Sequence, residues 1–248
     1  MITKCHHEVL CIIFEQKQST PYYGIIGETG IWPYKHVITY KKLMLLHHLI
    51  HSKDDRIAKQ IVLIQEKQGI EKSWYKELST KADELQLNVT TEYIQKKEKS
   101  EWKKIIKEKI NKIITSELNI EYETKTKLRF LKNKPFQKEE YLDKYPAMVC
   151  KDIMELRLNM IEVKANFKGR FKDEICVGCF QEKESTEHFL SCTKMQELTG
   201  YNININENNV KCPTWLHETS KKMKTMMEIR DRRANYKIAE TKELNHDS

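Results

Sequence analysis

The sequence predicts a mostly α-helical protein: an irregular helical bundle, then a small module held by a Cys/His cluster, then a C-terminal helix. The chain has only 7 glycines and 5 prolines in 248 residues and is rich in Lys, Glu, Ile and Leu, which favours helices over a multi-stranded sheet. Several stretches carry apolar residues three and four positions apart, the period of an amphipathic helix. Residues 176–192 hold cysteines and a histidine at metal-ligand spacing.

The N-terminal third is expected to contain a helical hairpin. Residues 1–18 show no clear period and are treated as a divergent leader. Residues 19–35 hold two prolines, three glycines and several aromatic residues, which predicts an ordered loop pinned by its aromatic side chains. Apolar-rich residues 37–51 predict a buried helix, and a second helix follows with Ser52 as its cap.

Two further helices are expected over residues 71–87 and 91–118. The second has the strongest periodicity in the chain, with apolar residues at Trp102, Ile105, Ile106, Ile110, Ile113 and Ile114. Its other face is basic, because residues 95–112 contain eight lysines against three glutamates. A phosphate backbone could lie along this face through Lys103, Lys104 and Lys107, although a solvated face with Glu–Lys pairs explains the pattern equally well.

Residues 19–135 are expected to form one helical region, and shorter segments follow it to the end of the chain. Residues 124–135 are expected to form a linker or a docked extended segment, because they are basic and end at a proline. Residues 136–174 are expected to form the next segment, a buried helix that leads to the module. This helix, over 148–167, is apolar around most of its circumference, so it should be packed between other elements. The module with the Cys/His cluster is expected at 175–195, and an Asn-rich spacer follows at 196–214. Residues 215–248 are expected to form a C-terminal helix that ends at about Lys237, followed by a frayed tail.

Composition limits the function classes. Hydrophobic residues are 39%, charged residues 32% and mean hydropathy is -0.69, so the core is modest. The formal charge of +8 suits a polyanionic partner but is also ordinary for a Lys-rich protein. The longest apolar run, residues 9–14, is far too short to span a membrane, and no signal peptide is recognisable. Scattered cysteines at 5, 11, 150 and 212 do not form a secreted disulfide framework, which indicates an intracellular protein of the nucleus or cytoplasm.

The Cys/His cluster is the most informative feature of the sequence. Its spacing, C-x2-C-x8-H-x3-C, predicts that one zinc ion is bound by Cys176, Cys179, His188 and Cys192. The small module that follows the helical bundle is therefore expected to be a zinc-stabilised CCHC module. The alternative, ordinary buried cysteines beside a surface histidine, is disfavoured because four ligand types rarely fall in one 17-residue window by chance.

Local geometry can be predicted for both halves of the cluster. Gly178 precedes the second cysteine, where a tight turn needs a residue that tolerates positive φ. His188 and Cys192 are four apart, so in a helix they would lie one turn apart on one face. Ser185 or Thr186 would cap that helix, and Phe189 would pack beneath the metal.

The zinc is expected to be structural. Four protein ligands leave no open position for water, whereas a catalytic zinc site keeps one. The order of the residues also lacks the H-x-E…P-C-x-x-C signature of zinc deaminases. His47, His48 and His51 lack a cysteine or carboxylate at ligand spacing and are expected to be surface or partly buried helix residues.

Several segments in order resemble one protein family. They are STPYYGIIGETGIWP, YKKLMLLHHLIHSKDDRIAKQI, SEWKKIIKEKI, TKTKLRFLK and LRLNMIEVKANFKGRFKDEICVGCFQEKESTEHFLSC. Together, from about Ser19 to Met195, they resemble the region after the polymerase core in non-LTR retrotransposon reverse transcriptases, most closely the RTE-like endonuclease/reverse transcriptase group. The resemblance implies a helical thumb-like and linker region that ends in a zinc knuckle and helps the polymerase hold element RNA and target DNA. It also implies that the four Cys/His residues are zinc ligands.

The chain departs from this family in its catalytic motifs. The aromatic-x-Asp-Asp turn that binds magnesium in the polymerase is absent, as are the endonuclease acids and histidine. The acid pair Asp54–Asp55 is interpreted as a helix cap. We therefore expect that the chain is truncated from a longer element and that the chain itself is not an enzyme.

Two function classes follow, with a third left open. In the first, a nucleic-acid-binding fragment contacts RNA or DNA through the lysine helix and a basic cluster before the module: Lys164, Lys168, Arg170 and Lys172. In the second, zinc folds a helical platform for a protein partner such as the polymerase core of a related element, with the 148–167 helix as its seam. In the third, the chain is an element remnant without a selected role.

Overall fold

The computed structural model describes residues 2–166, 171, 173–201, 203 and 213–244. Every regular element in this part is helical, apart from one antiparallel bridge between Ile175 and Lys183. The mostly α-helical fold class is thus confirmed. The helices are α1 (Ile2–Ile13), α2 (Tyr22–Thr29), α3 (Tyr34–Ile50), α4 (Ile57–Gln68), α5 (Trp74–Glu84), α6 (Thr91–Gln95), α7 (Lys99–Thr124), η1 (Thr126–Leu131), α8 (Tyr141–Lys144), α9 (Ala147–Arg157), η2 (Lys164–Asn166), α10 (Thr186–Ser191), α11 (Thr193–Thr199) and α13 (Pro213–Leu244).

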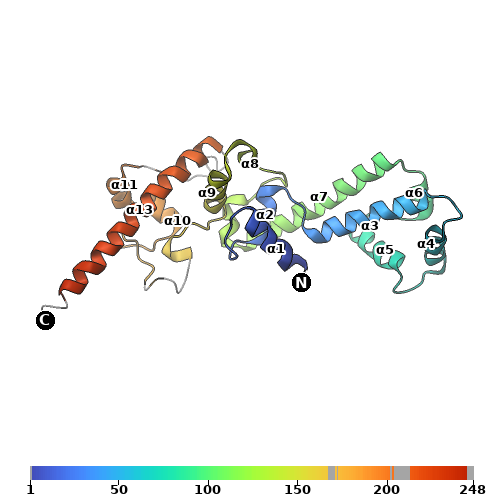
Figure 1. Ribbon diagram of the computed structural model, residues 1–248, viewed down its shortest axis with the longest axis horizontal. Helices are drawn as coiled ribbons and strands as arrows, with labels where there is room; N and C mark the ends of the chain where they lie inside the picture. The colour runs from blue at the N-terminus through green and yellow to red at the C-terminus, as the bar shows by residue number, and fades with distance from the viewer. Residues whose placement is uncertain (1, 167–170, 172, 202, 204–212, 245–248) are drawn as a thin grey trace.

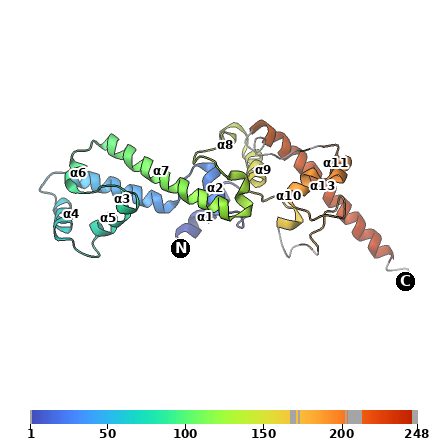
Figure 2. The same ribbon diagram turned by 180° about the vertical axis from the view of Figure 1, so that it is seen from behind.

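The molecule is elongated, with α3 and α7 side by side along one half and α10, α11 and α13 at the other end (Figures 1 and 2). α3 and α7 pack through the apolar period of α7, whose Trp102, Ile106 and Ile110 are fully buried. The Trp102 indole Nε1 donates to the Leu43 carbonyl at 3.2 Å, which fixes the register of the two helices. Within the described part of the chain, no helix combines the length and the apolar character needed to cross a bilayer.

The buried side chains form two hydrophobic clusters. The larger contains residues between Leu10 and Met160 and fills the space among α1 to α7, η1 and the end of α9. The smaller contains residues between Tyr141 and Met226 and includes Cys176, Cys192 and Phe189. α9 contributes to both clusters and therefore joins the two halves.

The first thirty residues are more helical than their sequence pattern predicts. α1 lies in the stretch that was expected to have no clear period; most of its apolar residues, including Ile2, Val9 and Ile12, share one side of the helix, and that side is exposed. The expected loop at 19–35 contains α2, which ends at Gly30 in the left-handed region with φ 64°. Gly24 and Gly27 are tolerated in that helix because neighbours approach its backbone: a Cβ on Gly24 would lie 2.7 Å from Leu158 Cδ2.

Several predicted boundaries need correction. The prediction of Ser52 as a cap is wrong: α4 begins at Ile57, Ser52 Oγ donates to the Leu49 carbonyl, and the turn at 54–55 does not cap the helix through a side chain. The helix expected at 91–118 is two helices, α6 and α7, separated where Glu98 is extended with ψ 148°. The expected linker at 124–135 forms the 3-10 helix η1, with Leu128 and Leu131 buried.

The helix in the segment before the module is also shorter than predicted. The expected helix at 148–167 is α9, which ends at Arg157 because Asn159 adopts a left-handed conformation with φ 52°. It is buried between other elements as expected, against η1 and α13. α11 (Thr193–Thr199) crosses the predicted boundary at 195 between the module and the Asn-rich spacer, and α13 runs on to Leu244 rather than ending near residue 237.

A buried charged network links α2 to α9 across the middle of the molecule. Glu28 is fully buried, and its carboxylate accepts from Arg157 Nε at 3.0 Å, from Tyr141 Oη at 2.7 Å and from Lys134 Nζ at 3.3 Å. Burial opposes ionisation of Glu28, but Arg157 and Lys134 outweigh it and lower the pKa of the carboxyl below its usual value. A buried ion network of this kind is costly to disrupt by removing one partner.

We expect Glu28→Gln to lower the free energy of unfolding by about 3 kcal/mol, because it leaves Arg157 and Lys134 buried with less negative charge. Urea unfolding followed by circular dichroism measures this change. The exposed Glu108→Gln on α7 is the matched control, with an expected effect within about 0.5 kcal/mol. Equal effects of the two substitutions would contradict the role of the network.

The same carboxylate predicts a pH dependence. Because the pKa of Glu28 is lower in the folded than in the unfolded chain, its contribution is complete at neutral pH and is lost as pH falls through the folded pKa. The stability difference between wild type and Glu28→Gln should therefore shrink on acidification.

Candidate metal centre

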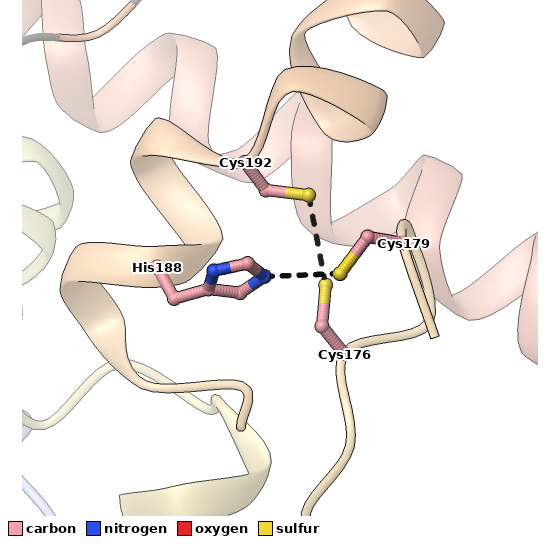
Figure 3. A group of neighbouring side chains, drawn as sticks. All are labelled: Cys176, Cys179, His188 and Cys192. Atoms are coloured by element: carbon pink, nitrogen blue, oxygen red, sulfur yellow. Dashed lines mark hydrogen bonds between the residues drawn. The ribbon is translucent and has the colours of Figure 1, made fainter. Parts of the chain in front are cut away.

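Four side chains converge on one point (Figure 3), in the half of the molecule that contains α10, α11 and α13 (Figure 1). One ligand atom from each of Cys176, Cys179, His188 and Cys192 lies within 4.8 Å of all the others. Cys176 Sγ is 3.9 Å from Cys192 Sγ, and Cys179 Sγ is 3.3 Å from His188 Nε2. Tetrahedral coordination with ordinary metal–sulfur and metal–nitrogen bonds needs separations of about 3.8 Å and about 3.5 Å. The four predicted ligands can thus hold one metal ion.

A short hairpin over residues 174–184 presents the first two ligands. The amide of Cys176 donates to the Glu182 carbonyl at 2.8 Å, and the amide of Glu184 donates to the Glu174 carbonyl at 2.7 Å. The amide of Phe180 closes the turn on the Cys176 carbonyl at 2.9 Å. Both Cys176 and Cys179 are therefore placed by backbone hydrogen bonds.

Gly178 has a different role from the one predicted. The residue with positive φ in this turn is Phe180, at φ 56°, not Gly178. Gly178 is instead required by close packing: a Cβ there would lie 2.6 Å from Met195 Cγ and 3.3 Å from Cys192 Sγ. Its amide also donates to Cys176 Sγ at 3.3 Å, which stabilises a thiolate at that position.

The other two ligands come from α10 and its end. Ser185 caps α10, as one of the two predicted alternatives, by accepting a hydrogen bond from the His188 amide at 3.1 Å. Cys192 lies just beyond the last residue of α10 and is extended, with ψ 116°, so the two ligands do not share a helical face as predicted. Phe189 is fully buried, consistent with packing beneath the site.

Glu182 orients the histidine and was missed by the sequence analysis. Its Oε2 lies 3.1 Å from His188 Nδ1, so the carboxylate accepts the Nδ1 proton and leaves Nε2 free to bind a metal. The only signal for it in the sequence is an acidic residue three positions after Cys179, which is too common a feature to single out.

The two hairpin thiols differ in acidity. Burial raises the pKa of Cys176 to about 12. Burial also opposes ionisation of Cys179, but the amides of Glu182 and Gln181 and the His188 ring outweigh it and lower that pKa to about 7. A metal ion must therefore displace a proton from Cys176, so metal binding weakens as pH falls.

A second buried carboxylate ties this module to α13. Glu184 is fully buried and accepts from Arg230 Nη1 at 3.1 Å, from the Lys164 amide at 3.1 Å and from the Val177 amide at 3.4 Å. The Arg230 guanidinium also lies 5.9 Å from the centre of the Phe189 ring and donates to the Glu162 carbonyl. The C-terminal helix α13 therefore holds the ligand-bearing hairpin in place through Arg230.

The predicted basic contacts are not gathered at this centre. Lys103, Lys104 and Lys107 lie exposed in the first half of α7, and no ion pair engages them among the residues that the structure describes. Lys164 lies near the module but pairs with Asp173 at 2.7 Å. The predictions for Lys168, Arg170 and Lys172 fall outside the described residues.

Of the three histidines considered as ligands, His47 belongs to the hydrophobic packing, whereas His48 and His51 are exposed. His47 is buried, and its Nε2 lies 2.9 Å from the Lys97 carbonyl. Its ring stacks on that of His51 at 4.1 Å between centroids. In the described part of the chain, the Cys176 group is the one cluster of at least three metal-ligating residues.

Comparison with protein-family models, with curated proteins and with solved structures finds no match for this chain.

We expect the purified chain to bind one Zn²⁺ and Cys176→Ser to bind far less, because the serine hydroxyl does not replace a thiolate ligand. Elemental analysis of dialysed protein measures the stoichiometry. Cys5→Ser, at an exposed cysteine outside the cluster, is the matched control and should retain the metal. Equal metal content in the two variants would contradict the assigned ligand set.

Glu182→Gln should weaken Zn²⁺ binding by about 10- to 100-fold, since the histidine loses the carboxylate that orients it. Competition against a chromogenic zinc chelator measures the affinity. Glu197→Gln, an exposed carboxylate on the neighbouring helix α11, should leave the affinity unchanged. An unchanged affinity in Glu182→Gln would show that this contact does not support the metal site.

Proposed function

We propose that this chain is a noncatalytic, zinc-stabilised, nucleic-acid-binding module derived from the region after the polymerase core of an RTE-like non-LTR retrotransposon reverse transcriptase. The observation that carries the proposal is the convergence of four ligand atoms of the right type at one point. The family assignment rests on the ordered sequence segments that include those ligands.

Zinc is the metal that best fits the ligand set. Three thiolates and one imidazole favour a soft or borderline ion in tetrahedral coordination. All four positions are taken by protein atoms, two of them from deeply buried cysteines, which favours a structural role over a catalytic one. We therefore propose one structural Zn²⁺ per chain, in an intracellular protein of the nucleus or cytoplasm.

The lysine face of α7 supports the nucleic-acid part of the proposal. Lys99, Lys103 and Lys107 follow one another at four-residue intervals, which puts them about 6 Å apart along the exposed side of the helix. A row of exposed cations at this spacing suits a polyanion backbone, where binding is driven by release of counterions.

The lysine row and the metal centre can engage the same strand only if that strand is long enough. From Lys103 to the end of α7 the helix rises about 30 Å, and the metal module lies beyond that end, where Arg129 of η1 contacts Glu187 of α10. A stacked strand advances about 3.4 Å per nucleotide, so contact at both places needs about ten nucleotides or more. We infer that the two ends of the molecule would form separate contacts on one nucleic acid.

The triple variant Lys103→Glu, Lys104→Glu, Lys107→Glu should bind RNA and single-stranded DNA much more weakly and with a shallower salt dependence. Loss of three phosphate contacts reduces the slope of log K against log salt by about 2 for single strands. Fluorescence anisotropy with a labelled oligonucleotide of about 20 nucleotides at several salt concentrations measures both quantities.

The matched control carries the same change of charge at exposed lysines on α3, α4 and α5: Lys41→Glu, Lys67→Glu and Lys76→Glu. If both triple variants lose affinity equally, the effect is one of net charge and the α7 site is wrong. If zinc-loaded wild type shows no salt-dependent binding at all, the nucleic-acid proposal as a whole is lost.

A second candidate function, a zinc-stabilised platform for a protein partner, is favoured by a different surface from the one predicted. The expected seam at 148–167 is largely buried within the chain. An exposed apolar face lies instead on α1.

A further inference from the structure

Helix α1 has most of its apolar residues on one side, and that side is exposed rather than packed on the bundle. The inner face packs on the bundle through the buried Leu10 and Cys11, and His7 Nε2 lies 2.8 Å from the Thr20 carbonyl. The outer face exposes four aliphatic side chains, namely Ile2 (54% exposed), Val9 (50%), Ile12 (73%) and Ile13 (62%). So much exposed aliphatic surface on a twelve-residue helix indicates a contact with another helix.

The outer face has the spacing of a helix-pairing seam. Ile2, Cys5, Val9 and Ile12 are separated by three, four and three residues, the a/d spacing of two packed helices. Beside them, a groove of ≈ 470 Å³ runs between α1 and the start of α3, lined by Ile2, Cys5, His6, Val9 and Tyr34. The groove gives a partner side chain a place to insert at the edge of the seam.

We propose that this seam, Ile2, Cys5, Val9 and Ile12, pairs with the same seam of a second copy of the chain, with the two α1 helices antiparallel about a two-fold axis. The spacing is self-complementary in that arrangement: Ile2 faces Ile12 of the second copy, and Cys5 faces its Val9. Each a position then meets a d position twice, as an isologous interface requires.

The available area suits a weak, reversible dimer. The exposed parts of the seam, Ile13 and Tyr34 amount to roughly 500 Å² per copy, or about 1,000 Å² in total, at the low end of specific interfaces. This interface is independent of the proposed nucleic-acid function, because it uses neither the metal ligands nor the α7 lysines.

Sedimentation velocity over a concentration series tests the proposal. Wild type should shift from monomer to dimer with rising concentration, and Ile12→Glu should raise the dissociation constant at least tenfold by placing a charge in the seam. Ile57→Glu, on α4 and 77% exposed, is the matched control and should dimerise as wild type does. A monomer at all concentrations, or an equal effect of the two variants, overturns the proposal.

Disulfide trapping tests the antiparallel arrangement. In Val9→Cys the introduced thiol faces Cys5 of the second copy, so mild oxidation should give a covalent dimer on a non-reducing gel. Adding Cys5→Ser should abolish it, which excludes links through other cysteines. Wild type should not form this dimer, because its two Cys5 residues lie four residues out of register; efficient linking through Cys5 alone would mean parallel pairing and overturn the arrangement.

Discussion

The carboxylate of Glu28 is the contact on which the relation between the two halves depends. It lies at the C-terminal end of α2, in the larger hydrophobic cluster, and binds Arg157 at the end of α9, which reaches into the smaller one. Lys134, from the segment between η1 and α8, and Tyr141, the first residue of α8, fill its remaining acceptor positions. Because a buried charge tolerates few geometries, this network sets where α9 can lie and, through α9, where α13 and the metal module begin.

The metal end repeats this device with a different carboxylate. Glu184 sits on the hairpin that carries Cys176 and Cys179, and it receives Arg230 from α13 and two backbone amides. Thr186 adds a hydrogen bond to Asn159, just after α9. The module is therefore held on one side by α13 and on the other by the turn that follows Arg157. The positions of its ligands therefore depend on a series of polar contacts that begins at Glu28.

The sequence was most informative where a pattern has one physical cause. The apolar period of α7 and the ligand spacing each require a single face or a single point, and the structure buries or half-buries the predicted face and brings the four predicted side chains together. α1 was missed although Ile2, Val9 and Ile12 share one side of the helix, and that side is exposed while the bundle is contacted through Leu10 and Cys11. The end of α9 was missed because it is set by Asn159, whose left-handed conformation is supported by a hydrogen bond from Thr186, 27 residues further along the chain. Glu182 and Glu184 could not be singled out because acidic residues are common, and their roles depend on a hairpin and on a helix more than forty residues away.

The two halves should differ in what stabilises them. α10 and α11 have six and seven residues, too few for a helix to persist in water without tertiary support. Their support is a small cluster in which Cys176 and Cys192 are both core residues and ligands, so a bound ion would contribute free energy on the order of 10 kcal/mol directly to folding there. The α3–α7 half buries Trp102 and a row of isoleucines and contains no ligand, so it does not draw on that energy. Metal release would thus unfold the module as one cooperative unit while leaving the lysine face of α7 in place. The affinity that survives chelation would then measure the α7 contact alone.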